Sequence, residues 1–296
     1  MSRIKNASRG VWIAGVCIAL IGVLSGATLT HTSFDETART AARPAVKPSA
    51  QWLASARSAL VQYLRRDPSP VAAIAGPSSN PTATSYNWSG YVDASTSKGL
   101  LSSVAGTWTT PSIKCTSEDS ITSEWVGLDG WKDKTVEQDG TLDWCFEGQA
   151  TYFTWYEMFP AGTIEVGTSL QPGDQITASV SRTAATTYRL SLTDHARPAD
   201  SFTEAATCPA TTCLDTSAEW IAERPDFQTT GFTPLADFGT WSVTDATVTE
   251  GTVVGTISSF HPVEVAMIDS TKSYLLSNPS SLFAKNSFST VWENSY

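Results

Sequence analysis

From Tyr86 to the C-terminus, the sequence is a succession of short runs rich in Val, Thr, Trp, Tyr and Phe, separated by turn-forming residues. β-branched and aromatic residues favour strands, and Gly next to Asp, Glu or Pro favours turns. No window of ten or more residues in this part shows convincing helical periodicity. This pattern predicts an all-β sandwich or barrel of about 210 residues.

The predicted strands are Asn87–Val92, Ser102–Trp108, Glu124–Gly127, Ala150–Met158, Gln175–Ser181, Tyr188–Thr193, Glu219–Ala222, Thr240–Thr247, Thr252–Ser258 and Val263–Ile268. Four turn signals separate several of these runs, and they are Asp129-Gly130, Asp139-Gly140, Pro172-Gly173-Asp174 and Glu250-Gly251.

The charge of the chain is acidic and unevenly distributed. Only 16% of the residues are charged, and the sequence pI is about 4.7. Residues 1–76 have a charge balance of +6, whereas residues 77–296 have a balance of −16. An acidic surface repels phosphate, so the composition argues against a nucleic-acid partner. A hydrophobic content of 41% with 11 Trp excludes a disordered or coiled-coil chain.

The N-terminal segment predicts export from the cell. Arg3, Lys5 and Arg9 precede the uncharged run Val11–Leu29, and Ser25-Gly26-Ala27 supplies small residues for cleavage. A basic region followed by an apolar run is typical of a secretory signal peptide, which we assign to residues 1–29. A retained membrane anchor is the alternative, because 19 apolar residues are long enough to span a bilayer. We therefore expect a secreted protein of a bacterial type.

Residues 30–78 separate the predicted signal from the β-rich domain, which we assign to residues 79–296. Within them, residues 51–66 show apolar positions at helical spacing and predict a short helix, which Asp67-Pro68 ends. The segment is basic and is followed by Gly, Pro and Ser, as at an exposed processing site. We expect a pro-segment that covers the acidic domain and is removed, with a plain helical linker as the alternative.

Four cysteines lie in the β-rich part, namely Cys115, Cys145, Cys208 and Cys213. An even number in a secreted chain predicts disulfides. Three connectivities are possible, and the order along the chain favours Cys115–Cys145 with Cys208–Cys213. A zinc site is disfavoured, because no pair has the C-x2-C spacing and only two histidines lie in this part.

Several familiar catalytic motifs are absent from the sequence. There is no G-x-S-x-G, no H-E-x-x-H, no Asp-Thr-Gly or Asp-Ser-Gly and no phosphate-binding Gly loop. His195 and His261 are the only histidines of the β-rich part, and we expect both to be structural. Carboxylates, carboxamides and aromatic rings remain, which suit general acid–base chemistry or sugar binding.

Five segments stand out in order along the chain. They are Asn87–Val92 (NWSGYV), Glu124–Gly130 (EWVGLDG), Glu137–Gly140 (EQDG), Trp155–Pro160 (WYEMFP) and Ser217–Glu223 (SAEWIAE), the last followed by Pro234–Gly239 (PLADFG). Together they resemble the motifs N-W-x-G, W-V-G-I-D-G, Q-x-G, W-Y-E-W-Y-P and A-E-(W/F)-I-x-E of the glutamic peptidases, the G1 or eqolisin family. Five ordered matches over about residues 86–240 are far more specific than any one of them.

The resemblance implies an antiparallel β-sandwich of the concanavalin-A-like type and a secreted, pepstatin-insensitive acid endopeptidase. By motif position, the catalytic pair is Gln138 and Glu223. The substrate cleft is expected to include Trp125, Asp129, Trp155 and Glu157. Residues 158–159 (Met-Phe) and 224–225 (Arg-Pro) depart from the family pattern, which affects substrate preference more than activity.

In the implied reaction, Glu223 accepts a proton from water while the water attacks the amide carbon. Gln138 orients that water and donates an N–H group to the developing oxyanion. Neither role needs a metal, another cofactor or a covalent intermediate. The implied partners are polypeptide substrates and the chain's own pro-segment as inhibitor, and we expect a monomer. Because 26 acidic residues repel one another at neutral pH, we also predict greater stability below about pH 5.

Three other functions fit the same composition. A carbohydrate-binding module could use the same sandwich, because a fold does not fix a function. A glycoside hydrolase would need two carboxylates about 5–10 Å apart, and here one partner is Gln138. A family member without activity is the third alternative, against which the presence of both Gln138 and Glu223 argues.

Overall fold

The computed structural model describes residues 51, 82–208, 213–227 and 231–296. The signal peptide predicted at residues 1–29 lies outside this part, as does the helix predicted at residues 51–66 except for Gln51. Within the described residues, none of the helices has the length and apolar character needed to cross a bilayer.

The described chain consists of strands joined by short connections, with two single-turn 3₁₀ helices. The strands are β1 Thr82–Ser85, β2 Trp88–Ala94, β3 Leu101–Thr109, β4 Ser120–Leu128, β5 Val136–Phe146, β6 Gln149–Phe159, β7 Ile164–Gly167, β8 Gln175–Ala184, β9 Thr187–Asp194, β10 Phe202–Thr207, β11 Ser217–Glu223, β12 Asp226–Phe227, β13 Gly231–Phe232, β14 Thr240–Glu250, β15 Val253–Thr256, β16 Val263–Ile268, β17 Leu275–Pro279 and β18 Phe288–Trp292. The 3₁₀ helices are η1 Pro198–Asp200 and η2 Ile257–Ser259.

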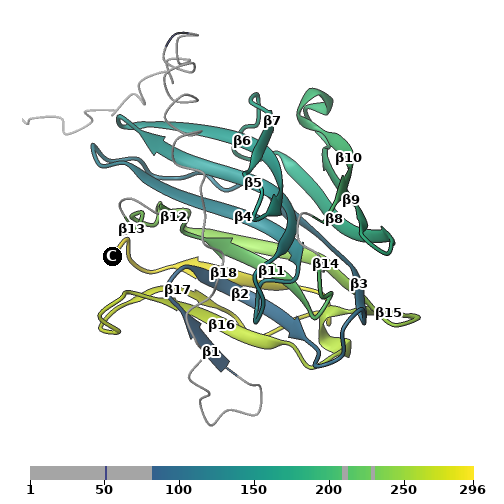
Figure 1. Cartoon of the computed structure of the whole chain (residues 1–296). Helices are drawn as coiled ribbons and strands as arrows, with labels where there is room; N and C mark the ends of the chain where they lie inside the picture. The colour runs from purple at the N-terminus through teal and green to yellow at the C-terminus, as the bar shows by residue number, and fades with distance from the viewer. Residues whose placement is uncertain (1–50, 52–81, 209–212, 228–230) are drawn as a thin grey trace, which may run out of the picture. The chain divides into compact units, whose positions relative to one another are not determined.

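Sixteen of these strands form one curled sheet in the order β10-β9-β8-β3-β14-β18-β17-β16-β2-β11-β4-β5-β6-β7, with β1 beside β16 and β15 beside β14. Every pairing among the described strands is antiparallel except β1 with β16. Figure 1 shows β4, β5 and β6 running side by side. The predicted all-β, antiparallel sandwich is confirmed.

The two halves of the sheet pack face to face through a hydrophobic core. Gly106 of β3 has no side chain, and the side chains of Trp220 of β11 and Val126 of β4 pack directly against it. A second hydrophobic cluster lies on the opposite face of β2, β11, β4, β5 and β6. Its largest side chains are Trp88, Trp125, Trp144, Trp155 and Phe153. The five-stranded layer is therefore buried on both faces.

Nine predicted strands correspond to strands of the structure, and the tenth, Thr252–Ser258, is split between β15 and η2. The turn predicted at Asp139-Gly140 is wrong, because both residues lie inside β5. The side chain of Asp139 is buried in the layer, and Gly140 packs beneath Trp125. The turns at Asp129-Gly130, Gly173 and Gly251 are confirmed by positive φ angles.

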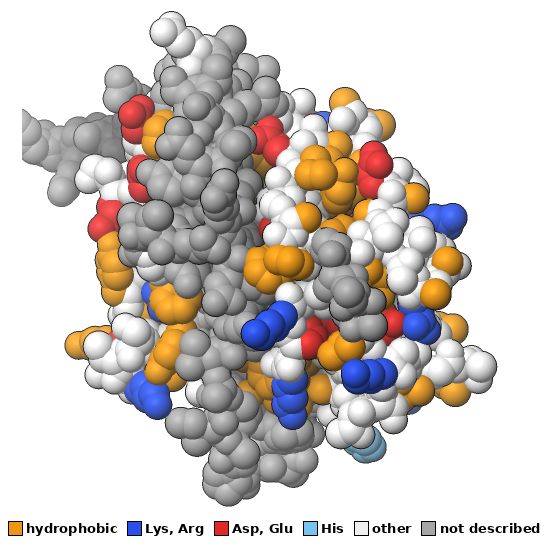
Figure 2. Space-filling view, viewed as in Figure 1, with side chains coloured by type: hydrophobic (Ala, Val, Ile, Leu, Met, Phe, Trp, Pro, Cys, Tyr) orange, Lys and Arg blue, Asp and Glu red, His pale blue; other side chains and the backbone are white. Residues whose placement is uncertain are grey.

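The surface follows the composition of the chain. Figure 2 shows charged side chains as separate groups among uncharged polar and hydrophobic atoms of the described residues. Hydrophobic side chains are spread over this face rather than gathered into one patch. The low charged fraction of 16% explains this surface.

Both favoured disulfides are present. Cys115–Cys145 ties the segment before β4 to the end of β5, across 30 positions. Cys208–Cys213 closes a loop of 5 positions between β10 and β11. The first bond therefore restrains a much longer stretch of the unfolded chain than the second.

We expect the two disulfides to contribute unequally to stability. By the loop-entropy relation, a Cys115→Ala/Cys145→Ala variant should lose about 3–4 kcal/mol of unfolding free energy, and Cys208→Ala/Cys213→Ala about 2 kcal/mol. Urea unfolding of both variants at pH 4 measures the difference. Equal losses, or a larger loss for the short loop, would contradict this expectation.

Candidate active site

The side chains of Gln138 and Glu223 lie on one face of the five-stranded layer. Strand β5 carries Gln138, β11 carries Glu223, and β4 runs between them. Gln138 is paired with Gly127 of β4, and Glu223 is paired with Ser123 of β4. Positions 123 and 127 differ by an even number, so both side chains project from the same face. Both are buried, with exposed fractions of 1% and 2%.

Trp125 links the two predicted catalytic residues. It lies on β4 between positions 123 and 127, and its indole Nε1 donates a hydrogen bond of 2.8 Å to Oε2 of Glu223. A Cβ atom added to Gly127 would lie 2.8 Å from the six-membered ring of Trp125 and 3.2 Å from Cβ of Gln138. The indole thus spans the sheet from Gln138 to Glu223.

Two glycines make room for this indole. A Cβ on Gly140 would lie 2.6 Å from Cβ of Trp125, and one on Gly127 would meet its ring. The glycines of the W-V-G and Q-x-G segments are therefore explained by close approach of Trp125 to the sheet. A larger residue at Gly127 would displace the indole, whereas a Cβ on Gly140 would also lie 2.1 Å from the carbonyl oxygen of Glu124 and so force β4 and β5 apart.

Glu157 holds the carboxamide of Gln138. It lies directly opposite Gln138 on β6, and its Oε2 accepts a hydrogen bond of 2.5 Å from Nε2 of Gln138. Its other oxygen accepts a hydrogen bond of 2.7 Å from the hydroxyl of Thr163, just before β7. Trp155, two positions before Glu157, pairs with Gly140 and is 1% exposed. Trp125, Trp155 and Glu157 are thus gathered with the predicted catalytic pair.

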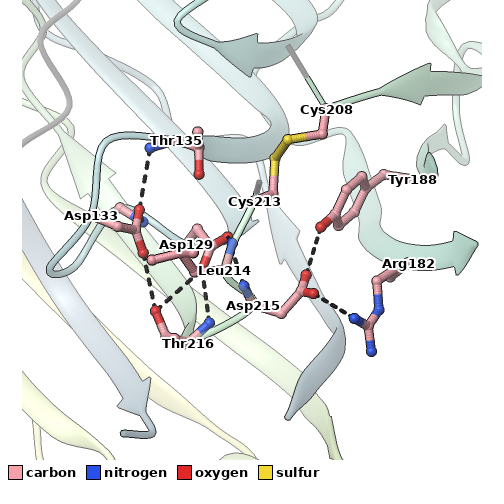
Figure 3. Close-up of a disulfide and its surroundings, with 11 residues drawn as sticks. Asp129, Asp133, Thr135, Arg182, Tyr188, Cys208, Cys213, Leu214, Asp215 and Thr216 are labelled. Atoms are coloured by element: carbon pink, nitrogen blue, oxygen red, sulfur yellow. Dashed lines mark hydrogen bonds and ion pairs between the residues drawn. A yellow bond between two sulfur atoms is a disulfide. The ribbon is translucent and has the colours of Figure 1, made fainter. Parts of the chain in front are cut away.

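Asp129 lies apart from this group and has another task. It adopts φ 68° at the end of β4, and its carboxylate accepts backbone N–H groups of Leu214, Asp215 and Thr216 at 2.7–2.8 Å. Asp133 of the same loop accepts the hydroxyl of Thr216 at 3.0 Å (Figure 3). The substrate-cleft role expected for Asp129 stays a prediction, and in the structure its carboxylate fixes the segment that leads into β11.

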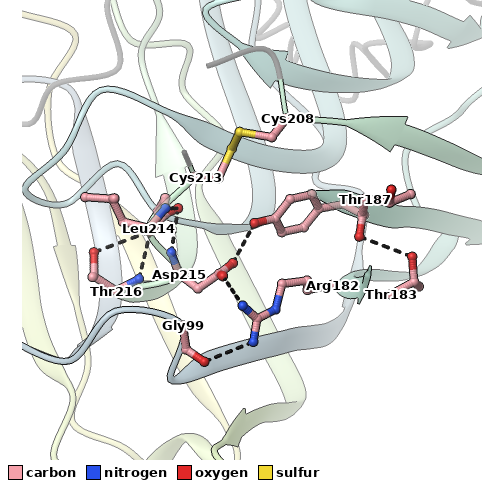
Figure 4. Close-up of polar contacts among 11 residues, drawn as sticks. Gly99, Arg182, Thr183, Thr187, Cys208, Cys213, Leu214, Asp215 and Thr216 are labelled. Atoms are coloured by element: carbon pink, nitrogen blue, oxygen red, sulfur yellow. Dashed lines mark hydrogen bonds and ion pairs between the residues drawn. A yellow bond between two sulfur atoms is a disulfide. The ribbon is translucent and has the colours of Figure 1, made fainter. Parts of the chain in front are cut away.

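We call the contacts of Asp129 and Asp133 with residues 214–216 the anchor of β11. A salt bridge from β8 and a hydrogen bond from β9 add to this anchor. The guanidinium of Arg182 donates to Oδ2 of Asp215 at 2.7 Å and to the carbonyl oxygen of Gly99 at 3.0 Å (Figure 4). Tyr188 donates its hydroxyl to the other oxygen of Asp215 at 2.7 Å. The segment that precedes β11 is therefore held by Asp129 after β4, by Arg182 of β8 and by Tyr188 of β9.

Several carboxyl groups are buried in the anchor of β11 and in the neighbouring strands β4 and β5. Carboxylate oxygens of Asp129, Glu137 and Asp215 lie within 4.8 Å of one another. Burial raises the pKa of Asp129 to about 7, and burial followed by the charge of Asp129 raises that of Glu137 well above its usual range. Burial likewise raises the pKa of Glu124 to about 8. These groups retain protons where an exposed carboxyl would be ionised.

The same three carboxyls are the acidic group among the described residues that could hold a metal. Asp129 already accepts three backbone N–H groups, and Asp215 is paired with Arg182. Few lone pairs remain for a cation, and an adjacent guanidinium repels one. A second group combines Glu137 with Cys208 and Cys213, whose sulfurs are joined in a disulfide and so are not thiolates. The arrangement favours a proton over a metal.

Sequence reasoning missed Thr163, Asp133 and Asp215. Each contacts a partner on another element. Asp133 contacts Thr216, 83 positions away, and Asp215 contacts Asp129, 86 positions away. Single polar residues in loops carry no periodic signal. The anchor could be found only once the register of β4 and β11 was known.

The comparisons with known proteins agree with this architecture. The sequence model of the Peptidase A4 family matches residues 86–280. Aspergillopepsin-2 of Aspergillus niger is 31% identical over 140 residues, which are 46% of this chain and 48% of that protein. The match therefore spans about half the length of this relative.

Solved structures with the same fold include peptidases bound to peptide-like ligands. Scytalido-glutamic peptidase, in complex with a peptide-based transition-state analogue, is 23% identical, with 70% of this chain and 98% of that chain covered and a TM-score of 0.59. SCP-B, a member of the eqolisin family in complex with the tripeptide Ala-Ile-His, is 22% identical, with the same coverage and a TM-score of 0.57. At these identities, the likeness concerns the fold.

Proposed function

Because this chain belongs to the Peptidase A4 family, the glutamic peptidases, we propose that it is a secreted endopeptidase that works in acid with Gln138 and Glu223 as its catalytic residues. The substrates are polypeptides, and the chain's own residues 30–78 act as an inhibitory pro-segment. The observation that carries the proposal is the indole of Trp125, which touches Glu223 and lies beside Gln138.

In the proposed reaction, the carboxylate of Glu223 takes a proton from water as the water oxygen bonds to the carbonyl carbon of the substrate. Gln138 donates an N–H group to the oxyanion of the tetrahedral intermediate. Protonated Glu223 then gives its proton to the amide nitrogen, the C–N bond breaks, and a carboxylic acid and an amine leave. All atoms come from substrate and water, so no covalent enzyme intermediate is needed.

Glu219 is a competing candidate for the general base. It projects from the same face of β11 as Glu223. Glu219 pairs with Gly127 of β4, which in turn pairs with Gln138 of β5, whereas Glu223 lies four residues further along β11. Burial raises the pKa of Glu219 well above its usual range, so its carboxyl is neutral in acid and cannot accept a proton there. The N–H group that Trp125 donates to Glu223 favours the ionised form of that carboxyl. These facts support Glu223 as the base.

Hydrolysis of casein by the acid-treated chain, measured from pH 2 to pH 8 with pepstatin present, tests the proposal. We expect pepstatin-resistant hydrolysis in the acid range, with loss of the N-terminal segment detected by mass spectrometry. If folded and processed protein hydrolyses nothing at any pH, the fold stands and the proposed function is wrong. A sugar-binding module or an inactive family member would then be the better description.

A further inference from the structure

Glu157 is held between two hydrogen-bond donors from different elements. Nε2 of Gln138 on β5 donates to one of its oxygens at 2.5 Å, and the hydroxyl of Thr163 donates to the other at 2.7 Å. Glu157 itself is 1% exposed. A buried carboxylate is costly unless donors surround it, so each of these two bonds favours the ionised form.

The charge of Glu157 decides which end of the Gln138 carboxamide faces it. An ionised carboxylate only accepts hydrogen bonds, so the NH₂ end of the amide must point toward it. The carbonyl end, Oε1, then points away and accepts no hydrogen bond among the described residues. This leaves Oε1 to accept a hydrogen bond from the attacking water, whose proton goes to Glu223, and the second N–H of Nε2 to donate to the oxyanion. A protonated Glu157 could instead donate to Oε1 and turn the amide over.

We propose that Thr163 is a positioning residue: by donating to Glu157, its hydroxyl keeps that carboxyl ionised and so fixes the orientation of the Gln138 amide. The proposal deepens the proposed function and rests on it for its role in catalysis. The orientation of the Gln138 amide can be measured independently of catalytic turnover.

The ionisable groups on the neighbouring strands also affect whether the carboxyl of Glu157 is ionised. On β5, Glu137 and Asp139 flank Gln138 in sequence and therefore project from the opposite face. On β7, Glu165 pairs with Trp155 rather than with Glu157. On β11, Glu219 and Glu223 project from the same face, three strands away from β6. These carboxyl groups, where they are ionised, oppose ionisation of Glu157, whereas the hydrogen bonds donated by Gln138 and Thr163 favour it.

The pH profile of kcat/KM tests the role of the hydroxyl. In Thr163→Val, the carboxyl of Glu157 loses one donor, so the acid limb of the profile should move to higher pH by about one unit. Thr163→Ser keeps a hydroxyl and should restore the wild-type limb. Thr183→Val is the matched control, because its hydroxyl donates only to the carbonyl oxygen of Thr187 on the other layer. An unmoved limb in Thr163→Val, or a uniform loss of activity at every pH, would overturn the proposal.

A second readout separates this proposal from the proposed function. The side-chain NH₂ signals of Gln138, assigned in ¹⁵N NMR spectra by their loss in Gln138→Ala, should titrate with Glu157. Their midpoint should lie about one pH unit higher in Thr163→Val than in the wild type and in Thr163→Ser. If the wild type is inactive but this midpoint moves, the peptidase proposal fails and the positioning role stands. If the wild type is active and the midpoint does not move, the positioning role is wrong.

Discussion

Replacing Glu223 by Gln is expected to lower kcat by about 10³-fold while the protein remains folded. The carboxamide has the size of the carboxylate and can still meet the indole N–H of Trp125 through its oxygen. It cannot accept a proton from water, so the attack on the amide carbon loses its general base. Substrate binding should change little, because the side chain otherwise keeps its shape.

Gln138→Ala should have a comparable effect for a different reason. The variant removes the proposed donor to the oxyanion, and the loss of one such donor lowers kcat by about 10²–10³-fold. It also removes the donor to Oε2 of Glu157. Because the two residues act on the same water, the double variant should be little worse than either single variant.

Glu219→Gln is the control for both substitutions. It sits on the same strand as Glu223 and is equally buried, but its carboxyl is neutral in acid. Substituting a neutral amide for a neutral carboxyl should change kcat less than about tenfold, measured with a peptide substrate at pH 4. A Glu219→Gln variant as inactive as the proposed dyad variants, beside an active Glu223→Gln, would assign the base to Glu219 instead.

The sequence patterns predicted β4, β6 and β11, three of the four strands that carry the site. The E-W-V-G-L-D-G segment contains both Trp125, which reaches Glu223, and Gly127, which gives the indole its place. In a regular strand the alternation of faces already places Glu219 and Glu223 together. Those features depend on local spacing, which a sequence displays directly.

Strand β5 shows why the rest was out of reach. Its sequence, VEQDGTLDWCF, looks polar enough for a turn at Asp139-Gly140, yet it is an 11-residue strand buried on both faces. Usual alternation fails here because Glu137, Asp139 and Asp143 are buried as carboxyls on the face opposite Gln138. Burial raises the pKa of each well above its usual range, so they pack as neutral groups. A sequence shows the residue type and does not show its protonation state.

The buried carboxyls predict a large loss of stability between acid and neutral pH. A carboxyl whose pKa is raised in the folded state stabilises the fold fully below its unfolded pKa. This contribution is lost as the pH rises through the folded-state value. The folded-state pKa values of about 7 for Asp129 and about 8 for Glu124 place much of this loss between pH 4 and pH 8.

Each such group weakens the fold by up to about 1.4 kcal/mol per pH unit within its window. With several groups acting together, the Tm at pH 7.5 should lie about 10 °C or more below that at pH 4. Melting is best followed in a Gln138→Ala background, so that self-digestion does not contribute. A higher Tm at pH 7.5 than at pH 4 would contradict the prediction.

Glu137→Gln should recover part of the stability that the wild type loses at neutral pH. Glu137 lies against Asp129 and Asp215, so its ionisation places a third negative charge beside the anchor of β11. A neutral amide cannot ionise, and the difference in unfolding free energy between pH 4 and pH 7.5 should shrink by about 1–3 kcal/mol. Glu204→Gln, on the exposed strand β10, is the matched control and should leave the difference unchanged. If both variants behave alike, the loss at neutral pH reflects the net charge of the whole domain rather than this cluster.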